Sequence, residues 1–325
     1  MLLETQNLSI GYGRLIVQQN LNLSVSAGNL ICLIGTNGSG KSTLLRTLAG
    51  LQKPLKGTVL VQDSIVSRLS QHERALIFSL VLTDFINEEN MTVFDIVSLG
   101  RFPYTNWLGD LSSKDREIIQ EAIGQVNLTR KECCYLREIS DGEKQRAIIA
   151  KALTQDTPLV LLDEPTAYLD LPNRIEIMLL LRRLSLDTGK TFILSTHELD
   201  LAMQMSDRIW LMHSDGIEVG IPEDLMLTGR LQHIFGSNSF MFDRRDGHFC
   251  IRHTRGDLRV QVFGDEIPVL WTIRALNRMG IVVEENADIQ VQANSNRFAV
   301  RRNEFSQWQE ASSIEALLQF ICLEL

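Results

Sequence analysis

A glycine-rich segment with one lysine and several hydroxyl residues is the clearest chemical signal in the sequence. It reads GTNGSGKST, spans residues 35–43 and follows the apolar run NLICLI. Glycines let the backbone turn tightly and approach a phosphate closely, and consecutive N–H groups at a helix start attract an anion. The spacing predicts that Lys41 reaches the β- and γ-phosphates of a nucleotide, whereas Ser42 binds Mg²⁺. The alternative is a plain strand-to-helix turn. The predicted nucleotide-binding residues are Gly35, Asn37, Gly38, Ser39, Gly40, Lys41, Ser42 and Thr43.

Two further apolar runs end in residues that would complete such a site. Asp163 and Glu164 end PLVLLDE, and His197 follows KTFILST. We expect Asp163 to hold Mg²⁺ through water and Glu164 to accept a proton from an attacking water. His197 would contact the γ-phosphate or that water. A solvated strand end and a structural histidine are the alternatives.

The stretch EISDGEKQRAIIAKAL predicts a helix that begins near Asp141. Its N-terminal amides could bind another phosphate. Ser140 and Glu143 have the spacing of a capping box, in which each side chain binds the other residue's N–H group. The capped helix and the phosphate contact are compatible.

The surrounding pattern predicts an α/β fold. The first thirty residues often alternate apolar and polar, as antiparallel strands with one buried face do. The runs at 29–35, 158–165 and 190–196 read as buried strands that alternate with helices, which indicates a mainly parallel sheet covered on both faces. Residues 92–152 are mostly helical in pattern. After about Gly236 a separate α+β unit is expected, so the predicted domains are 1–236 and 237–325.

Composition restricts the function classes. The chain has 325 residues, 44% hydrophobic and 22% charged, with a net charge of −8. An acidic chain argues against a nucleic-acid partner, which would require a basic face. The sequence shows neither a membrane-spanning run nor a signal peptide, and its cysteines form no CxxC pair.

The order of the glycine loop, ISDGEKQR, LLDEPTAYLD and STH resembles the ABC-transporter ATPases over about Leu2 to Gly229. The resemblance implies a P-loop ABC ATPase core with an antiparallel β-subdomain and a helical subdomain, to which a small C-terminal α+β domain is added. ATP and Mg²⁺ would be its ligands. Two copies would form a head-to-tail dimer with two ATP molecules at the interface.

The resemblance also assigns roles to single residues. Ser140 and Gly142 would contact the γ-phosphate held by the opposite copy, and Asp170 would link the two sites. Tyr12 would stack on adenine, by analogy with base stacking on aromatic side chains; an exposed turn tyrosine is the alternative.

Two departures from the family pattern concern the same site. The signature of the family usually reads Leu-Ser-Gly-Gly-Gln. Here it is Ile139-Ser140-Asp141-Gly142-Glu143, so Asp141 and Glu143 replace a glycine and the glutamine. Thr83 stands where most relatives have a glutamine that touches Mg²⁺ or water.

The segment from Asn90 to Gly109 resembles ATPases of importers for iron-siderophore, haem and cobalamin. Phe102, Pro103 and Tyr104 would help receive a membrane subunit, unless this loop packs only on itself. The implied partners are a second copy, two membrane-spanning permease subunits and a periplasmic or surface substrate-binding protein. The chain would then lie at the cytoplasmic face of the inner membrane.

Other functions stay open. The alternatives are a soluble ABC ATPase that is not coupled to transport and a nucleotide-binding switch with little hydrolysis. The C-terminal domain would either hold two ATPases together or sense a small molecule that regulates transport.

Overall fold

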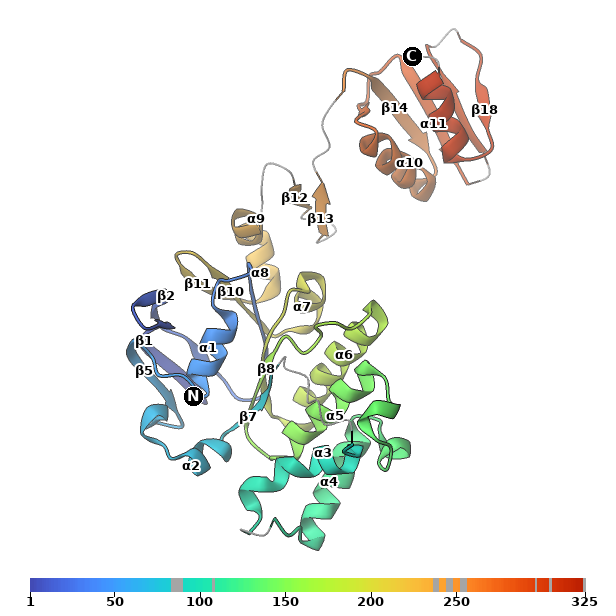
Figure 1. Ribbon diagram of the computed structural model, residues 1–325. Helices are drawn as coiled ribbons and strands as arrows, with labels where there is room; N and C mark the ends of the chain where they lie inside the picture. The colour runs from blue at the N-terminus through green and yellow to red at the C-terminus, as the bar shows by residue number, and fades with distance from the viewer. Residues whose placement is uncertain are drawn as a thin grey trace. The chain divides into compact units, whose positions relative to one another are not determined.

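The computed structural model describes residues 1–82, 90–106, 109–235, 240–243, 248–251, 256–295, 297–303 and 306–323. Its contacts divide into two compact units, Met1–Phe235 and Gly236–Leu325. The predicted domains had their boundary one residue later. Figure 1 shows both units, and each is described by itself below.

The first unit is built on a six-stranded sheet with the order β11-β10-β4-β9-β8-β7. Neighbouring strands from β10 to β7 are parallel, whereas β11 is antiparallel. Every residue of β4, β8 and β9 is buried, as expected for apolar runs in a sheet that is covered on both faces. The strands are β4 (Leu30–Gly35), β7 (Phe78–Val81), β8 (Leu159–Asp163), β9 (Thr191–Ser195), β10 (Arg208–His213) and β11 (Gly216–Gly220).

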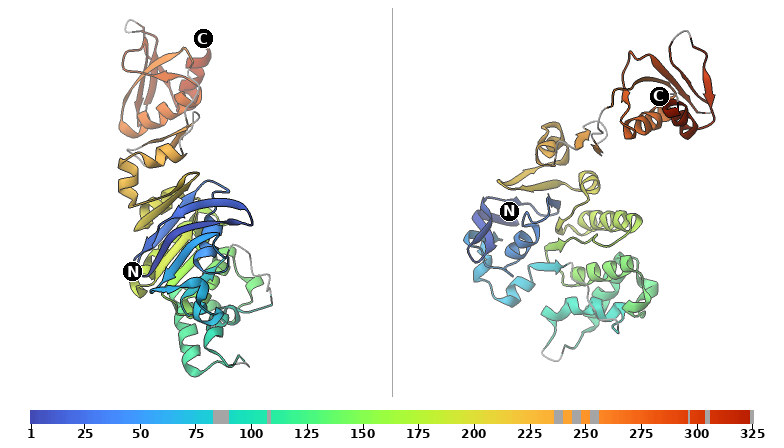
Figure 2. Two further views of the ribbon diagram at one scale, coloured as in Figure 1. Left: turned by 90° about the vertical axis from the view of Figure 1, so that its left-hand side faces the viewer. Right: turned by 45° about the horizontal axis from the view of Figure 1, so that its top comes forward.

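An antiparallel sheet forms from the alternating N-terminal segments. Its strands are β1 (Leu3–Tyr12), β2 (Leu15–Leu21), β3 (Ser24–Val25), β5 (Lys56–Val61) and β6 (Ser64–Ile65). Helix α1 (Lys41–Leu48) buries Leu44, Leu45 and Leu48 in a core shared with residues of β1, β4, β5 and β10. Figure 2 shows α1 between this sheet and the larger one. The predicted fold class is confirmed.

Helices complete the first unit. They are α2 (Gln71–Ala75), α3 (Val93–Ser98), α4 (Ser113–Gln125), α5 (Asp141–Thr154), α6 (Leu171–Thr188), α7 (Leu199–Met205), α8 (Pro222–Leu227) and α9 (Arg230–Phe235), with the 3-10 turns η1 (Val66–Arg68), η2 (Leu99–Tyr104), η3 (Thr129–Lys131) and η4 (Leu136–Glu138). Between residues 92 and 154, α3, α4 and α5 pack on one another and form the helical subdomain (Figure 1).

A buried ion pair fixes η2 inside the helical subdomain. Arg101 Nε lies 2.8 Å from Asp115 Oδ1 of α4, and Arg101 also donates to the Thr154 carbonyl of α5 at 2.8 Å. A buried charge needs such partners because burial removes its water. Gly100 permits the close approach, since a Cβ there would lie 2.1 Å from the Lys151 carbonyl oxygen.

The second unit contains a five-stranded sheet with the order β15-β14-β16-β17-β18. Val260, Leu276, Val291 and Leu317 form the centre of its core. Helix α10 begins at Glu266, before the predicted run VLWTIRALNRMG, because Pro268 is tolerated in a first helical turn. The short strands β12 and β18 were not predicted. The elements are β12 (Phe240–Asp243), β13 (His248–Ile251), β14 (Arg259–Gly264), α10 (Glu266–Arg278), β15 (Val282–Val283), β16 (Ile289–Asn294), β17 (Arg297–Arg301), β18 (Gln309–Ala311) and α11 (Ile314–Leu323).

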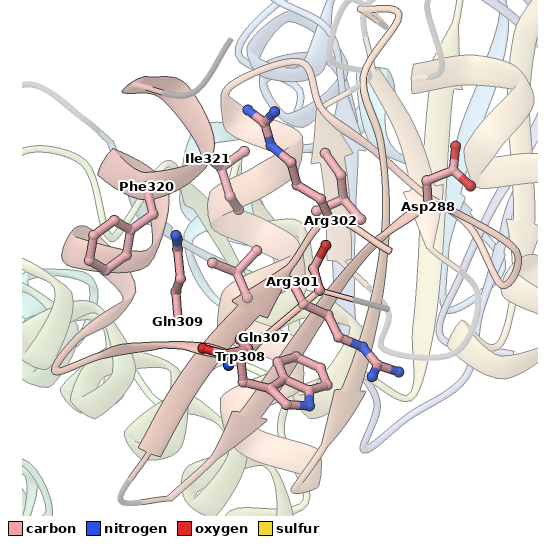
Figure 3. Close-up of a pocket in the computed structure, with 11 residues that line it drawn as sticks. Asp288, Arg301, Arg302, Gln307, Trp308, Gln309, Phe320 and Ile321 are labelled. Carbon is pink, nitrogen blue, oxygen red and sulfur yellow. The ribbon is translucent and has the colours of Figure 1, made fainter. Parts of the chain in front are cut away.

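A cavity of about 920 Å³ lies in this second unit, where β17 and the following loop approach the end of α11. Figure 3 shows its wall of apolar and polar side chains, with Phe320 and Ile321 from the helix and Trp308 and two arginines from the strand and loop. The Arg301 guanidinium lies 4.6 Å from the centre of the Trp308 ring.

Among the residues that the structure describes, no helix has the length and apolar character needed to span a bilayer.

Gly100 provides a test of the packing between η2 and α5. Gly100→Ala should lower the free energy of unfolding by about 1–3 kcal/mol, because the added methyl group overlaps backbone atoms of α5. The matched control is Gly124→Ala in α4, where the nearest atom would be 3.9 Å from the new Cβ. That variant should gain up to about 1 kcal/mol from helix propensity. Urea unfolding curves measure both; equal stabilities would contradict the packing argument.

Candidate functional site

The glycine loop joins β4 to α1 at the carboxyl end of the parallel sheet. Gly38 and Gly40 have positive φ values of 77° and 105°, which glycine adopts at little cost. A Cβ at Gly40 would lie 2.4 Å from Val17 Cγ1 of β2, so this glycine also lets the loop pack on the antiparallel sheet. The loop thereby presents its backbone at the start of α1, where a helix attracts anions.

Lys41 is buried beneath this loop. Its Nζ atom donates to the carbonyl oxygens of Gly35 and Thr36 at 3.0 and 3.3 Å. Burial lowers the pKa of Lys41, whereas the charges of Glu164 and Asp163 act in the opposite direction. An anion brought to the loop would therefore favour the charged lysine.

The ends of three elements, β8, β9 and α1, meet in a hydrogen-bond network beside Lys41. Asp163, at the end of β8, accepts from Ser42 Oγ of α1 at 2.9 Å and from Ser195 Oγ of β9 at 2.7 Å. Ser195 Oγ in turn accepts the Glu164 N–H at 2.9 Å. The parallel register places Asp163 opposite Ser195, which explains why these groups meet.

Glu164 and His197 form the exposed end of this network. Glu164 Oε1 lies 2.7 Å from His197 Nε2, and both side chains are partly exposed. Glu164 has a φ of 49°, an uncommon value for a non-glycine residue that often accompanies a functional position. A carboxylate held by a histidine next to solvent can accept a proton from water.

Tyr12 lies at the end of β1 and reaches the same region from the antiparallel sheet. Its hydroxyl group lies 3.0 Å from Thr43 Oγ1, so the loop helix holds one end of the side chain. The side chain is 53% exposed, which leaves ring surface available for stacking on a base.

The signature residues form a separate group at the start of α5. Ser140 is the N-cap, and the expected capping box is present: Glu143 N–H donates to Ser140 Oγ at 3.3 Å, and Ser140 N–H donates to the Glu143 carboxylate at 3.0 Å. Figure 1 shows α5 and α1 well apart. Among the described residues, no hydrogen bond joins Ser140, Asp141, Gly142 or Glu143 to the glycine loop.

Asn173 connects the signature to Asp170. Its side-chain Nδ2 donates to Asp170 Oδ1 at 2.7 Å, and a Cβ at Gly142 would lie 2.4 Å from Asn173 Oδ1. Asp170 is also the N-cap of α6 and accepts the Asn173 N–H at 3.1 Å. The two predicted interface positions therefore lie in one local cluster.

Sequence reasoning missed Ser195 and Asn173. Ser195 had a signal, because it lies in the STH segment that contains His197, but the strand register was needed to place it against Asp163. Asn173 had no signal, since its contact with Gly142 depends on the packing of α6.

Thr83 lies outside the described residues. Phe102 and Tyr104 are exposed in η2, although Tyr104 also donates to the Gln155 carbonyl at 3.0 Å.

The residues present fit a nucleotide with a divalent cation. Ser39 Oγ, inside the glycine loop, is buried and has no hydrogen-bond partner among the described residues. No described atom would lie within 4 Å of a Cβ at Gly38, so that face of the loop is open to a ligand. Ser42 and Asp163 offer oxygen atoms, the donors that Mg²⁺ prefers.

The chain is similar to known families and proteins. A family model described as ABC transporter matches residues 18–167, and one described as iron ABC transporter C-terminal domain matches 257–322. A probable siderophore transport system ATP-binding protein of Bacillus subtilis is 36% identical over 264 residues, which cover 80% of this chain and 95% of that protein.

Two solved structures are similar to the first unit in fold. One is a metal-chelate type ABC transporter in an inward-facing conformation, with a TM-score of 0.64, 27% identity and coverage of 72% of this chain and 88% of that one. The other is a dimeric ATP-binding cassette bound to ADP and phosphate, with a TM-score of 0.59, 27% identity and coverage of 68% and 98%. With its glycine loop, its network at Asp163 and its signature helix, this chain belongs to the ABC transporter ATP-binding proteins, which hydrolyse ATP.

Proposed function

We propose that this ATPase energises an importer for iron-siderophore complexes. The observation that carries the proposal is the Asp163–Ser195–Glu164–His197 network beside the glycine loop, in which Glu164 would serve as a general base next to a phosphate site. The siderophore assignment is supported by the Bacillus relative and by the match of the second unit to an iron transporter domain. Importers of haem or cobalamin are the nearest alternatives.

The chain's own residues would divide the reaction between them. The loop amides and Lys41 bind the β- and γ-phosphates, and Tyr12 stacks on the adenine base. Glu164 Oε accepts a proton from the attacking water, and His197, 2.7 Å away, orients that carboxylate and contacts the γ-phosphate. The partly exposed position of Glu164 lets water reach it.

Ser42 and Asp163 would hold Mg²⁺, the latter through a water molecule. When bound, the cation neutralises charge on the β- and γ-phosphates. Ser195 keeps the Asp163 carboxylate oriented toward Ser42 by donating to the same oxygen atom. Asp163 and Ser195 are both buried, so the network is shielded from competing water.

The complete site requires a second copy of the chain. Ser140 and Gly142 lie on a different element from the glycine loop, and one copy gives them no described contact with it. The dimeric cassette with ADP and phosphate supports a dimer. We infer a head-to-tail arrangement for this chain, in which each signature would face the nucleotide of the other copy. Asp170, through Asn173, would belong to the same interface.

Coupling to transport would use the exposed part of η2. Phe102 is 75% exposed at the end of a segment that is fixed to α4 and α5 through Arg101. Phe102, Pro103 and Tyr104 would contact one of two membrane-spanning permease subunits, so that the chain lies at the cytoplasmic face of the inner membrane. A periplasmic or surface binding protein would deliver the ligand.

The second unit would hold two copies together when the ATP sites open. Helix α10 supports this role because Ile267, Leu270 and Trp271 are exposed along one side of it. The cavity lined by Trp308 and Phe320 supports the other candidate role, a sensor of a small molecule.

Glu164→Gln should retain ATP binding and slow hydrolysis by about 10²–10⁴-fold, since the amide cannot accept the proton. The variant should accumulate as a dimer with ATP, as seen by light scattering, while phosphate release gives the rate. Lys41→Ala is the contrasting variant and should lose ATP binding instead. Rapid turnover by Glu164→Gln would exclude this carboxylate as the base.

Transport by the reconstituted complex tests the proposed ligand. Vesicles that contain the permease subunits, this ATPase and the binding protein should take up a ferric siderophore at the expense of ATP, and should take up haem and cobalamin more slowly. Phe102→Ala should reduce uptake while the isolated ATPase keeps its turnover, because Phe102 lies in η2, outside the hydrogen-bond network that contains Glu164. Preferential uptake of haem or cobalamin would replace the siderophore assignment.

The role of α10 is tested with Ile267→Glu combined with Trp271→Glu. Buried in a dimer contact, the two charges would be unfavourable, so the mass of the full chain without ATP should fall from dimer to monomer. Leu186→Glu in α6 is the matched control at another exposed apolar residue. If the double variant keeps the dimer mass, the sensor role is favoured.

A further inference from the structure

The carboxylate of Glu143 contacts a residue from outside its own helix. Lys131 Nζ, in η3, lies 2.7 Å from Glu143 Oε1 and donates to Glu143 Oε2 at 2.8 Å. The same Oε2 atom accepts the Ser140 N–H at 3.0 Å, and Ser140 Oγ accepts the Glu143 N–H. A continuous set of contacts therefore runs from Lys131 through Glu143 to the N–H group and the hydroxyl group of Ser140.

Lys131 also neutralises the negative charge that Glu143 brings to the signature. The hydrogen bond from Lys131 is the main reason why the pKa of Glu143 lies below its ordinary value, so this side chain is an anion. An anion beside the place where a triphosphate binds is unfavourable unless an opposite charge lies close to it. Lys131 supplies that charge, and the neutral pair then resembles the uncharged glutamine that the family usually has at this position.

The second carboxylate of the signature is neutralised in a different way. Asp141 Oδ1 lies 3.0 Å from Lys144 Nζ, one turn further along the same helix. The Asp141 side chain is 61% exposed, and no described hydrogen bond joins it to Ser140. The Lys144 N–H donates to the Ser140 carbonyl oxygen at 2.9 Å, but this is a backbone contact that a side-chain substitution leaves in place. Lys144 therefore offers a lysine–carboxylate pair of equal charge whose side chains form no described hydrogen bond with Ser140.

We propose that Lys131 is a positioning residue for ATP hydrolysis, which holds Ser140 through Glu143 in the orientation that meets the partner's γ-phosphate. The inference rests on the proposed function, in which Ser140 contacts the nucleotide of the second copy. Lys131 and Glu143 are both partly exposed, and ion pairs of this kind contribute little to folding. The contact should therefore affect the reaction more than the stability of the chain.

The test uses the full chain with Lys131→Met. Turnover at saturating ATP should fall about tenfold, the size expected when a charge-assisted hydrogen bond is lost. Affinity for a fluorescent ATP analogue, measured on dilute protein, should stay within a factor of about two of the original, because the glycine loop is untouched. The thermal unfolding midpoint should not change.

Rescue variants separate positioning from general charge effects. Lys131→Arg should restore turnover because it keeps the charge and the donor. Lys131→Met combined with Glu143→Gln should also restore it, since glutamine preserves the capping box without a charge. Lys144→Met, the matched control, should change turnover less than about twofold, as expected for an exposed pair.

Several outcomes would overturn the inference: full turnover of Lys131→Met, an equal loss in Lys144→Met, no rescue by Glu143→Gln, or a lowered unfolding midpoint of Lys131→Met.

The Ser140→Ala variant separates a failure of this inference from a failure of the proposed function. If Ser140→Ala keeps full turnover, the signature does not act on ATP at all and the proposed dimeric site is wrong. If Ser140→Ala loses turnover but Lys131→Met does not, only the role of Lys131 fails.

Discussion

A buried carboxylate that must be hydrogen-bonded organises the part of this protein around the glycine loop. Asp163 is 5% exposed, and its charge is tolerable there because Ser42 and Ser195 both donate to it. Those two donors come from α1 and β9, so satisfying one carboxylate fixes three elements at one point. The glycine loop directly precedes α1, whereas Glu164 and His197 follow β8 and β9 in the chain. Their placement is therefore a consequence of the same constraint.

The fold and several local features of the candidate site could be predicted from the sequence because local rules determine them. The apolar runs that became β4, β8 and β9 are buried on both faces, and the glycines at 38 and 40 have the positive φ values that the loop requires. Ser140 and Glu143 form the capping box that their spacing indicates. Each of these features depends on residues that are close in the sequence.

The features that could not be predicted depend on contacts between distant segments. Ser195 meets Asp163 only because β8 and β9 are in parallel register, and Asn173 meets Gly142 only because α6 packs beside α5. Lys131 is an ordinary exposed lysine in the sequence and acquires its partner through the fold of the helical subdomain. Strand β18 has only three residues, too few for a periodic pattern.

The cluster at Asn173 has a mechanical consequence. Its amide fills the space that Gly142 leaves by having no Cβ, and it also binds Asp170 at the beginning of α6. The helix that begins after Ser140 and the helix capped by Asp170 thus meet at one side chain, Asn173. A displacement of either helix therefore disturbs the packing of Asn173 against the other, which couples the positions of the two helix starts within one chain.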